Sequence, residues 1–85
     1  MAPHFADPYK YLGDAQFTAK RFNDAGASYA AAARMAPRWG ANQLMWGKAL
    51  WQAGSRDEAR QKFAAARGMD LSASDRLWLD RIGRP

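Results

Sequence analysis

Side chains that could perform catalysis or hold a metal are few in this chain. His4 is the single histidine, and the sequence contains no cysteine. A catalytic triad or a histidine metal site needs further partners, so His4 alone supports neither. Asp57 and Glu58 are adjacent carboxylates, but neighbouring side chains on a helix point about 100° apart and do not share a substrate. A preference for negative charge in the first turn of a helix explains this pair better.

The glycines do not form a phosphate-binding loop, because Gly13, Gly47 and Gly54 are spread along the chain and are not gathered in one motif. The absence of cysteine also excludes disulfides, thiol catalysis and cysteine-ligated metals. We therefore expect a protein that is not an enzyme and that uses no cofactor and no metal.

The charge of the chain is basic but dispersed. There are 13 lysines and arginines against 8 acidic residues, a net charge of +5, and the longest basic run is Lys20-Arg21. Nucleic-acid surfaces usually cluster such residues on one face, so this distribution argues against nucleic-acid binding. No run approaches the roughly 18 apolar residues of a membrane span, and the first residues lack the features of a signal peptide. We expect a soluble, cytoplasmic protein, and abundant alanine with 9 arginines against 4 lysines favours a bacterial source.

Helix start and stop signals predict an all-α chain of five helices without strands. We expect helices over residues 7–19, 23–35, 41–53, 55–67 and 72–83. The first begins at Asp7 with a proline next to it, and Asn23 is a good cap for the second. Ser55 and Glu58 have the spacing of a capping box at the start of the fourth helix, and Ser72 opens the fifth. The short connections make consecutive helices antiparallel neighbours, which gives two hairpins and a single last helix.

An internal repeat organises these helices. Ala25 recurs as Ala59 and Tyr29 as Phe63, and the offset between the two members is the same in both pairs. A fixed period of this length, about 34 residues, is typical of stacked helical arrays, which present binding surfaces far more often than active sites.

The repeated residues resemble the tetratricopeptide repeat family. The first copy reads Tyr9-x2-Leu12-Gly13-x2-Gln16, then Ala25-x3-Tyr29-x2-Ala32 and Pro37; the second reads Gln43-x2-Trp46-Gly47-x2-Leu50, then Ala59-x3-Phe63-x2-Ala66 and Leu71. The resemblance implies a right-handed solenoid of helical hairpins in one domain over residues 1–85. Its repeats would cover about 6–39 and 40–73, followed by a capping helix over about 74–83.

The residue types suit such a hairpin stack. Gly13 and Gly47 would let the two helices of each hairpin approach closely, with Ala25 and Ala59 as the small partners. The bulkier Tyr29 and Phe63 would fill the space between successive hairpins. Trp46 is expected in the core, and Tyr9, Leu12, Gly13 and Gln16 are expected to face the second helix. Gln16, Gln43 and Leu71 depart from the family pattern and suggest slightly loosened packing.

The two ends of the chain carry different signals. Met1-Ala2-Pro3-His4-Phe5 reads almost like Met35-Ala36-Pro37-Arg38-Trp39, which follows it at the same repeat offset. We expect the chain to be the C-terminal part of a longer array, since about three repeats are usually needed for a stable stack; otherwise self-association must cover the first hairpin. The last helix is expected to cap the array, with Leu77, Trp78 and Ile82 on the fourth helix and Arg76, Asp80 and Arg81 in water.

The resemblance places a binding groove along the first helix of each hairpin. The side chains expected to line it are Lys10, Asp14 and Phe17, with Leu44, Lys48 and Trp51 at the same stripe one repeat later. Two aromatic rings flanked by lysines would suit an apolar peptide with negative charge. Alternatively, Phe17 and Trp51 pack against each other and against Leu44 between the hairpins. A clamp for a terminal carboxylate is disfavoured, because Asp14 and Met45 replace the asparagines that the family uses.

The sequence thus predicts a non-catalytic module that binds a protein or peptide partner in this groove. Two alternatives stay open: an element for homo-oligomerisation, and an accessory docking domain of a larger bacterial enzyme.

Overall fold

The computed structural model describes residues 6–82 and contains five helices, as predicted. These are α1 (Asp7–Thr18), α2 (Phe22–Met35), α3 (Gly40–Gln52), α4 (Arg56–Arg67) and α5 (Ala73–Ile82). No strand occurs in this part of the chain, which confirms the all-α fold. The segment with His4 and Phe5, and the predicted helix end at Gly83, lie outside the described residues.

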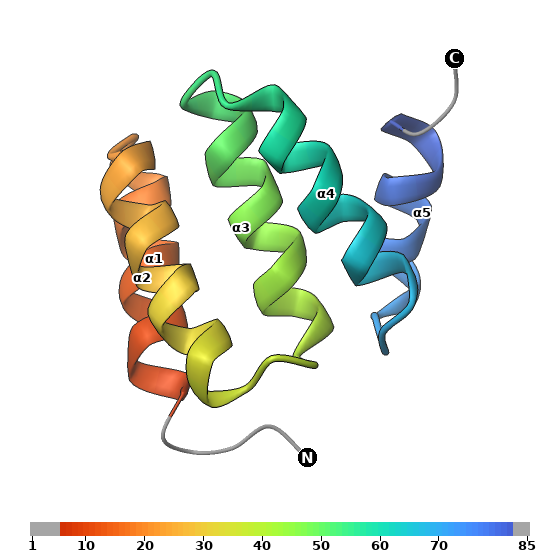
Figure 1. Cartoon of the computed structure of the whole chain (residues 1–85), viewed down its shortest axis with the longest axis horizontal. Helices are drawn as coiled ribbons and strands as arrows, with labels where there is room; N and C mark the ends of the chain where they lie inside the picture. The colour runs from red at the N-terminus through yellow and green to blue at the C-terminus, as the bar shows by residue number, and fades with distance from the viewer. Residues whose placement is uncertain (1–5, 83–85) are drawn as a thin grey trace.

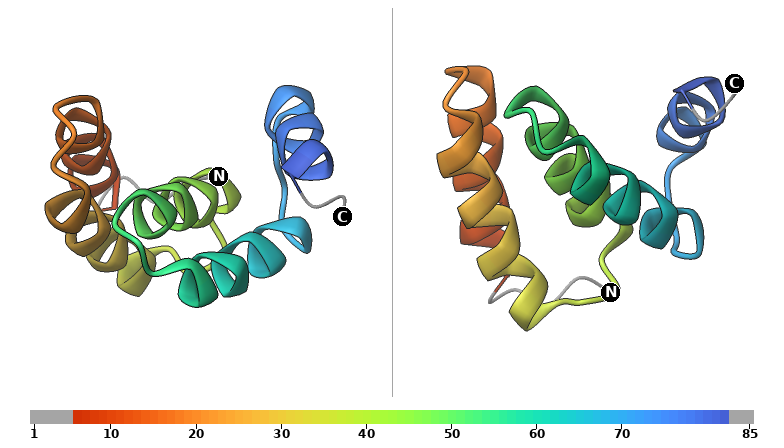
Figure 2. Two further views of the ribbon diagram at one scale, coloured as in Figure 1. Left: turned by 90° about the horizontal axis from the view of Figure 1, so that it is seen from above. Right: turned by 45° about the horizontal axis from the view of Figure 1, so that its top comes forward.

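The helices form two antiparallel hairpins and a flanking last helix (Figure 1). The helix α1 packs on α2 and α3 packs on α4, and the hairpins meet mainly through α2 and α3. Seen from above, α1 and α5 stand on either side of α3, whereas α2 and α4 lie together on the opposite side (Figure 2). The first helix of each hairpin and α5 therefore share one side of the molecule.

Close approach within each hairpin depends on a glycine, as the sequence predicts. A Cβ atom at Gly13 would lie 2.7 Å from a ring carbon of Tyr29, and one at Gly47 would lie 2.6 Å from a ring carbon of Phe63. The predicted partners are the alanines, but the aromatic rings of the same hairpin are the nearest atoms. Each ring lies directly against its glycine because no side chain intervenes.

A polar contact replaces apolar packing at one of the departures from the repeat pattern, Gln16. Ser28 donates a hydrogen bond from Oγ to Oε1 of Gln16 over 2.6 Å, so this glutamine joins α1 to α2. Gln43 is buried in α3. Asn42, fully buried next to it, donates from Nδ2 to the carbonyl oxygen of Tyr29 over 2.9 Å and joins the two hairpins.

The helix ends differ in part from the predicted caps. Asp7 is the first residue of α1 and not its cap, and α2 begins at Phe22, one residue before Asn23. Ser55 precedes α4 without a side-chain cap hydrogen bond, so the predicted capping box is not formed. Ser72 does cap α5, since its Oγ accepts a hydrogen bond from the Asp75 N–H over 3.2 Å.

The last helix is rotated relative to the prediction. Leu79 is its fully buried residue and belongs to the core of α3 and α4, whereas Leu77 is 64% exposed and Ile82 is 43% exposed. Asp80 and Arg81 face solvent as predicted. Three consecutive large apolar residues at positions 77–79 leave the buried face of this helix undetermined in the sequence.

On the outer side, α1 is more open than predicted. Tyr9 is 41% exposed and Leu12 is 50% exposed, so neither is enclosed against α2. Trp46 is half-buried: it packs against Ala25, Tyr29 and Ala49, with the Lys62 ammonium 3.9 Å from its ring centroid.

Candidate functional site

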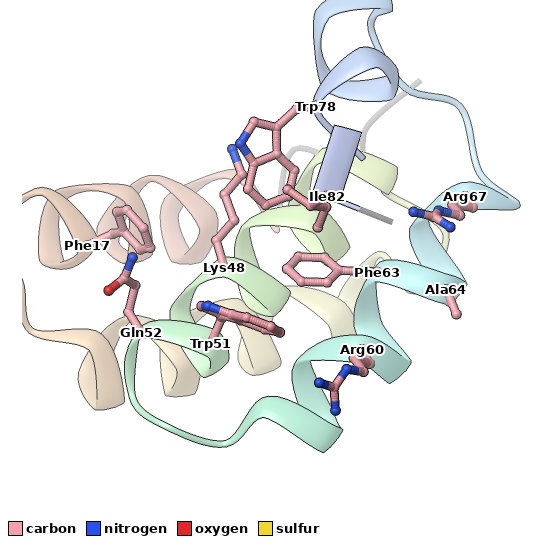
Figure 3. Close-up of a pocket in the computed structure, with 10 residues that line it drawn as sticks. All are labelled: Phe17, Lys48, Trp51, Gln52, Arg60, Phe63, Ala64, Arg67, Trp78 and Ile82. Carbon is pink, nitrogen blue, oxygen red and sulfur yellow. The ribbon is translucent and has the colours of Figure 1, made fainter. Parts of the chain in front are cut away.

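A groove opens on the side that α1, α3 and α5 share. It encloses about 820 Å³ and receives side chains from four helices (Figure 3). The residues that line it are Phe17 from α1; Lys48, Trp51 and Gln52 from α3; Arg60, Phe63, Ala64 and Arg67 from α4; and Trp78 and Ile82 from α5.

Aromatic rings from three successive helices follow one another along the groove. The centroids of Trp51 and Phe63 are 6.4 Å apart, and those of Phe63 and Trp78 are 5.5 Å apart with the rings edge to face. Phe63 lies between the two tryptophans in the close-up and is buried, while both tryptophans are half-buried (Figure 3). These ring contacts, one tilted and one edge to face, fix ring positions, so the groove wall is held in place before any ligand arrives.

Phe17 and Trp51 both line the groove, as the sequence predicts. Each packs against a ring of its own hairpin: Phe17 meets Phe22 edge to face at 5.2 Å, and Trp51 meets Phe63. No ring pair joins Phe17 to Trp51 among the ring contacts of residues 6–82. The two aromatics therefore stand apart along the same groove.

Three residues predicted for the groove have other positions. Leu44 is 1% exposed and lies in the core, where it packs with Phe63 and Leu79. Lys10 and Asp14 do not line the groove either; they pair with each other, with 2.9 Å between Nζ and Oδ2. The other oxygen of Asp14 accepts a hydrogen bond from the Tyr29 hydroxyl over 2.6 Å, so this carboxylate joins α1 to α2. One turn of helix separates Lys10 from Asp14, and this spacing favours their pairing.

The part of the groove that α4 and α5 provide was not predicted from the sequence. A usable signal was present, because Leu44 and Lys48 shifted by one further repeat period give Trp78 and Ile82. Both of these residues line the groove. The stripe of the first two repeats thus continues on the last helix, which the sequence reasoning treats as a cap alone.

Basic side chains surround the rings, and none of the residues that line the groove is acidic. The Lys48 ammonium lies 4.3 Å from the centroid of the Trp78 ring. The guanidinium groups of Arg56 and Arg60 lie 4.6 Å and 5.6 Å from the centroid of Trp51. Cations at these distances are attracted to ring faces, so both tryptophans carry a positive charge at the groove.

Two arginines hold α5 at the edge of the groove. Arg67 of α4 donates to the carbonyl oxygen of Leu79 over 2.7 Å, and Arg76 of α5 donates to the carbonyl oxygens of Arg67 and Met69 over 3.4 Å and 3.0 Å. Each arginine thus donates to carbonyl oxygens at or just beyond the C-terminal end of the other helix, the region where helices leave carbonyl groups without helical partners. This reciprocal arrangement positions Trp78 over Phe63.

Within residues 6–82, no group of three or more histidine, cysteine, aspartate or glutamate side chains gathers in a way that could hold a metal ion. Likewise, no described helix is long and apolar enough to cross a membrane.

No family model, no curated protein and no solved structure matches this chain. Its function must therefore be inferred from the groove and from the repeat itself.

Proposed function

We propose that this chain is a non-catalytic protein-interaction module of the tetratricopeptide-repeat type, which holds a segment of a partner protein in the groove between α1 and α5. The observation that carries the proposal is the set of rings formed by Trp51, Phe63 and Trp78 in a groove of about 820 Å³. The resemblance of the two repeats to that family supports the same function.

The energetics of this surface suit a partner segment. Burying an exposed aromatic side chain completely contributes roughly 2–3 kcal/mol, so completing the burial of a half-buried ring contributes about half of that. Tryptophan and arginine are also the side chains that most often dominate protein interfaces. Since the rings are held by contacts with one another, little ordering cost is left for the binding step.

The experiment is a selection of random displayed peptides on the full chain, followed by NMR of the labelled protein with each selected peptide. We expect the indole N–H signals of Trp51 and Trp78, which line the groove, to shift on binding. The indole signal of Trp46, which is not a groove residue, serves as an internal control and should stay in place. Selected peptides that leave both groove signals unchanged would refute the proposal.

A second candidate function, assembly through the outer face of α1, has an observation of its own. On α3, the residues that face the first hairpin are Asn42, Met45, Trp46 and Ala49. The equivalent positions one repeat earlier, on α1, are exposed, and they are Pro8, Tyr11, Leu12 and Ala15. These four residues of α1 are apolar in type. The helix α1 therefore presents to solvent a face equivalent to the one through which α3 packs on the first hairpin.

Sedimentation over a concentration series tests this second function. If the face of α1 joins copies of the chain, the mean mass rises with concentration, and Leu12→Lys keeps the protein monomeric because it places a charge in the contact. A strict monomer at all concentrations would exclude self-association of this chain.

A further inference from the structure

Lys48 is the cation of the groove that contacts a ring but has no hydrogen bond or ion pair within residues 6–82. Arg67 is bound to the Leu79 carbonyl oxygen, and Arg60 pairs with Asp57 at 3.0 Å. Lys48 reaches from α3 toward Trp78 and lies beside its ring (Figure 3). Among residues 6–82, no hydrogen bond or ion pair engages its ammonium group, which carries three donors.

The surroundings of Lys48 leave room for an external negative charge. Its side chain is half-buried among groove residues of which none is acidic. Burial lowers the pKa of Lys48, and the negative charge of Asp75 acts against that shift without forming an ion pair. An ammonium that has lost part of its hydration and found no acceptor gains more from a carboxylate than an exposed lysine does.

We propose that the groove selects partner segments in which an aspartate or glutamate lies close to a large apolar side chain, and that Lys48 binds the carboxylate while Trp51, Phe63 and Trp78 enclose the apolar group. This inference rests on the proposed function and adds the chemistry of the ligand. The charge of the groove carries the choice, since its lining includes the basic side chains Lys48, Arg60 and Arg67 and no acidic residue. Asp57 and Asp75, which act on Arg60 and Lys48, lie outside this lining.

A protein segment fits this surface better than a single-stranded nucleic acid. Stacking of bases requires open ring faces. Here Lys48 lies over the Trp78 ring, and Arg56 and Arg60 lie over the Trp51 ring. Phe63 is only 6% exposed, so too little of its ring face is open for a base to stack on it, although its exposed part still lines the groove. Apolar side chains, in contrast, need only the space between these rings.

The test uses the full chain and peptides from the random displayed selection, labelled with a fluorophore for anisotropy. We expect the selected peptides to be enriched in aspartate or glutamate next to a large apolar residue. Replacing the carboxylate by its amide should weaken binding about tenfold, the effect of losing one hydrogen bond between charged groups. Lys48→Met should weaken binding of the acidic peptide by a similar factor and should weaken binding of the amide peptide much less. Lys48→Arg should keep most of the affinity for the acidic peptide.

Lys62 provides a matched control for Lys48. Its ammonium also lies over a tryptophan, 3.9 Å from the Trp46 ring centroid, but it does not line the groove. Lys62→Met should therefore leave the affinity for the acidic peptide unchanged. Equal losses in the two methionine variants would show a general effect of net charge and would overturn the role of Lys48.

The outcomes separate this inference from the proposed function. Peptides that shift the Trp51 and Trp78 signals but bind equally well without a carboxylate would overturn the inference and leave the proposed function standing. Absence of any shift at both tryptophans would overturn both. Tighter, Lys48-dependent binding of a labelled oligothymidine than of any selected peptide would assign the groove to nucleic acid.

Discussion

Lys20 and Gly54 occupy equivalent positions in the two repeats and end the first helices of their hairpins with the same backbone geometry. Both have positive φ angles, 64° at Lys20 and 94° at Gly54. In each turn the N–H two positions after the helix cap reaches back to a helix carbonyl: Arg21 to Gln16 over 2.8 Å, and Ser55 to Leu50 over 2.9 Å. These are Schellman turns, which favour glycine at the left-handed position.

The first hairpin therefore carries strain that the second avoids, and Lys20→Gly should stabilise the protein. Removing a left-handed side-chain conformation gains about 1–2 kcal/mol, and the added freedom of glycine in the unfolded chain costs about 0.5–1 kcal/mol. We expect the free energy of unfolding, measured with urea, to rise by up to about 1.5 kcal/mol. Gly54→Lys should lower it by a similar amount, and a destabilised Lys20→Gly protein would contradict this account.

Gly47→Ala should be strongly destabilising, whereas Gly26→Ala should not. A Cβ at Gly47 would lie 2.6 Å from the Phe63 ring and 3.3 Å from the Ala59 carbonyl oxygen, and the ring is held between Trp51 and Trp78. Overpacking of this kind costs about 1–3 kcal/mol. At Gly26, inside α2, no atom lies within 4 Å of an added Cβ, so alanine should gain about 0.5–1 kcal/mol from helix preference.

Thermal unfolding of the two variants in parallel checks this prediction. The melting temperature should fall for Gly47→Ala and rise for Gly26→Ala. A Gly47→Ala protein as stable as the parent would mean that Phe63 can leave its position between the tryptophans.

The repeat made the fold predictable, because residues such as Gly13 and Gly47 recur at equivalent positions and allow the same close packing in both hairpins. The groove was half predictable for the same reason: Phe17, Lys48 and Trp51 line it. Helix caps were less so, since the turn before α4 is closed by backbone hydrogen bonds and not by the Ser55 side chain.

The misplaced residues have a common physical cause. Helical spacing predicts which residues share a face but not which face packs on a neighbouring helix. For this reason Leu44 was expected in the groove and is buried, and Leu77 was expected to be buried where Leu79 is. Asp14 shows another limit, because its bond to Tyr29 joins two different helices, which the spacing within one helix cannot indicate.

Leucine-to-alanine changes in α5 test the observed orientation of that helix directly. Leu79 is fully buried against the core of α3 and α4, so Leu79→Ala should cost about 2–5 kcal/mol of unfolding free energy. Leu77 is 64% exposed, and Leu77→Ala should change stability by no more than about 0.5 kcal/mol. Denaturant titrations of the two variants decide between the faces; a larger loss at Leu77 would support the orientation predicted from sequence.

The stability of the protein should fall at alkaline pH because of Tyr29. This residue is fully buried, and its hydroxyl donates to Oδ1 of Asp14 over 2.6 Å. Burial raises the pKa of Tyr29 far above its usual value, and the hydrogen bond and negative charge of Asp14 raise it further. Above about pH 10, where tyrosine ordinarily ionises, the unfolded chain releases this proton while the folded chain keeps it.

The folded state then binds more protons than the unfolded state, so the free energy of unfolding decreases as the pH rises, by up to about 1.4 kcal/mol per pH unit from this group. Below about pH 10 the contribution is fully present. Tyr29→Phe removes the group and should therefore flatten the alkaline part of the profile relative to the parent. At neutral pH the variant should lose about 1.5–3 kcal/mol, the contribution of a hydrogen bond to a charged carboxylate. Urea unfolding of both proteins from about pH 8 to about pH 11 measures the difference. Parallel alkaline slopes would show that Tyr29 ionises as readily in the folded protein as in the unfolded chain.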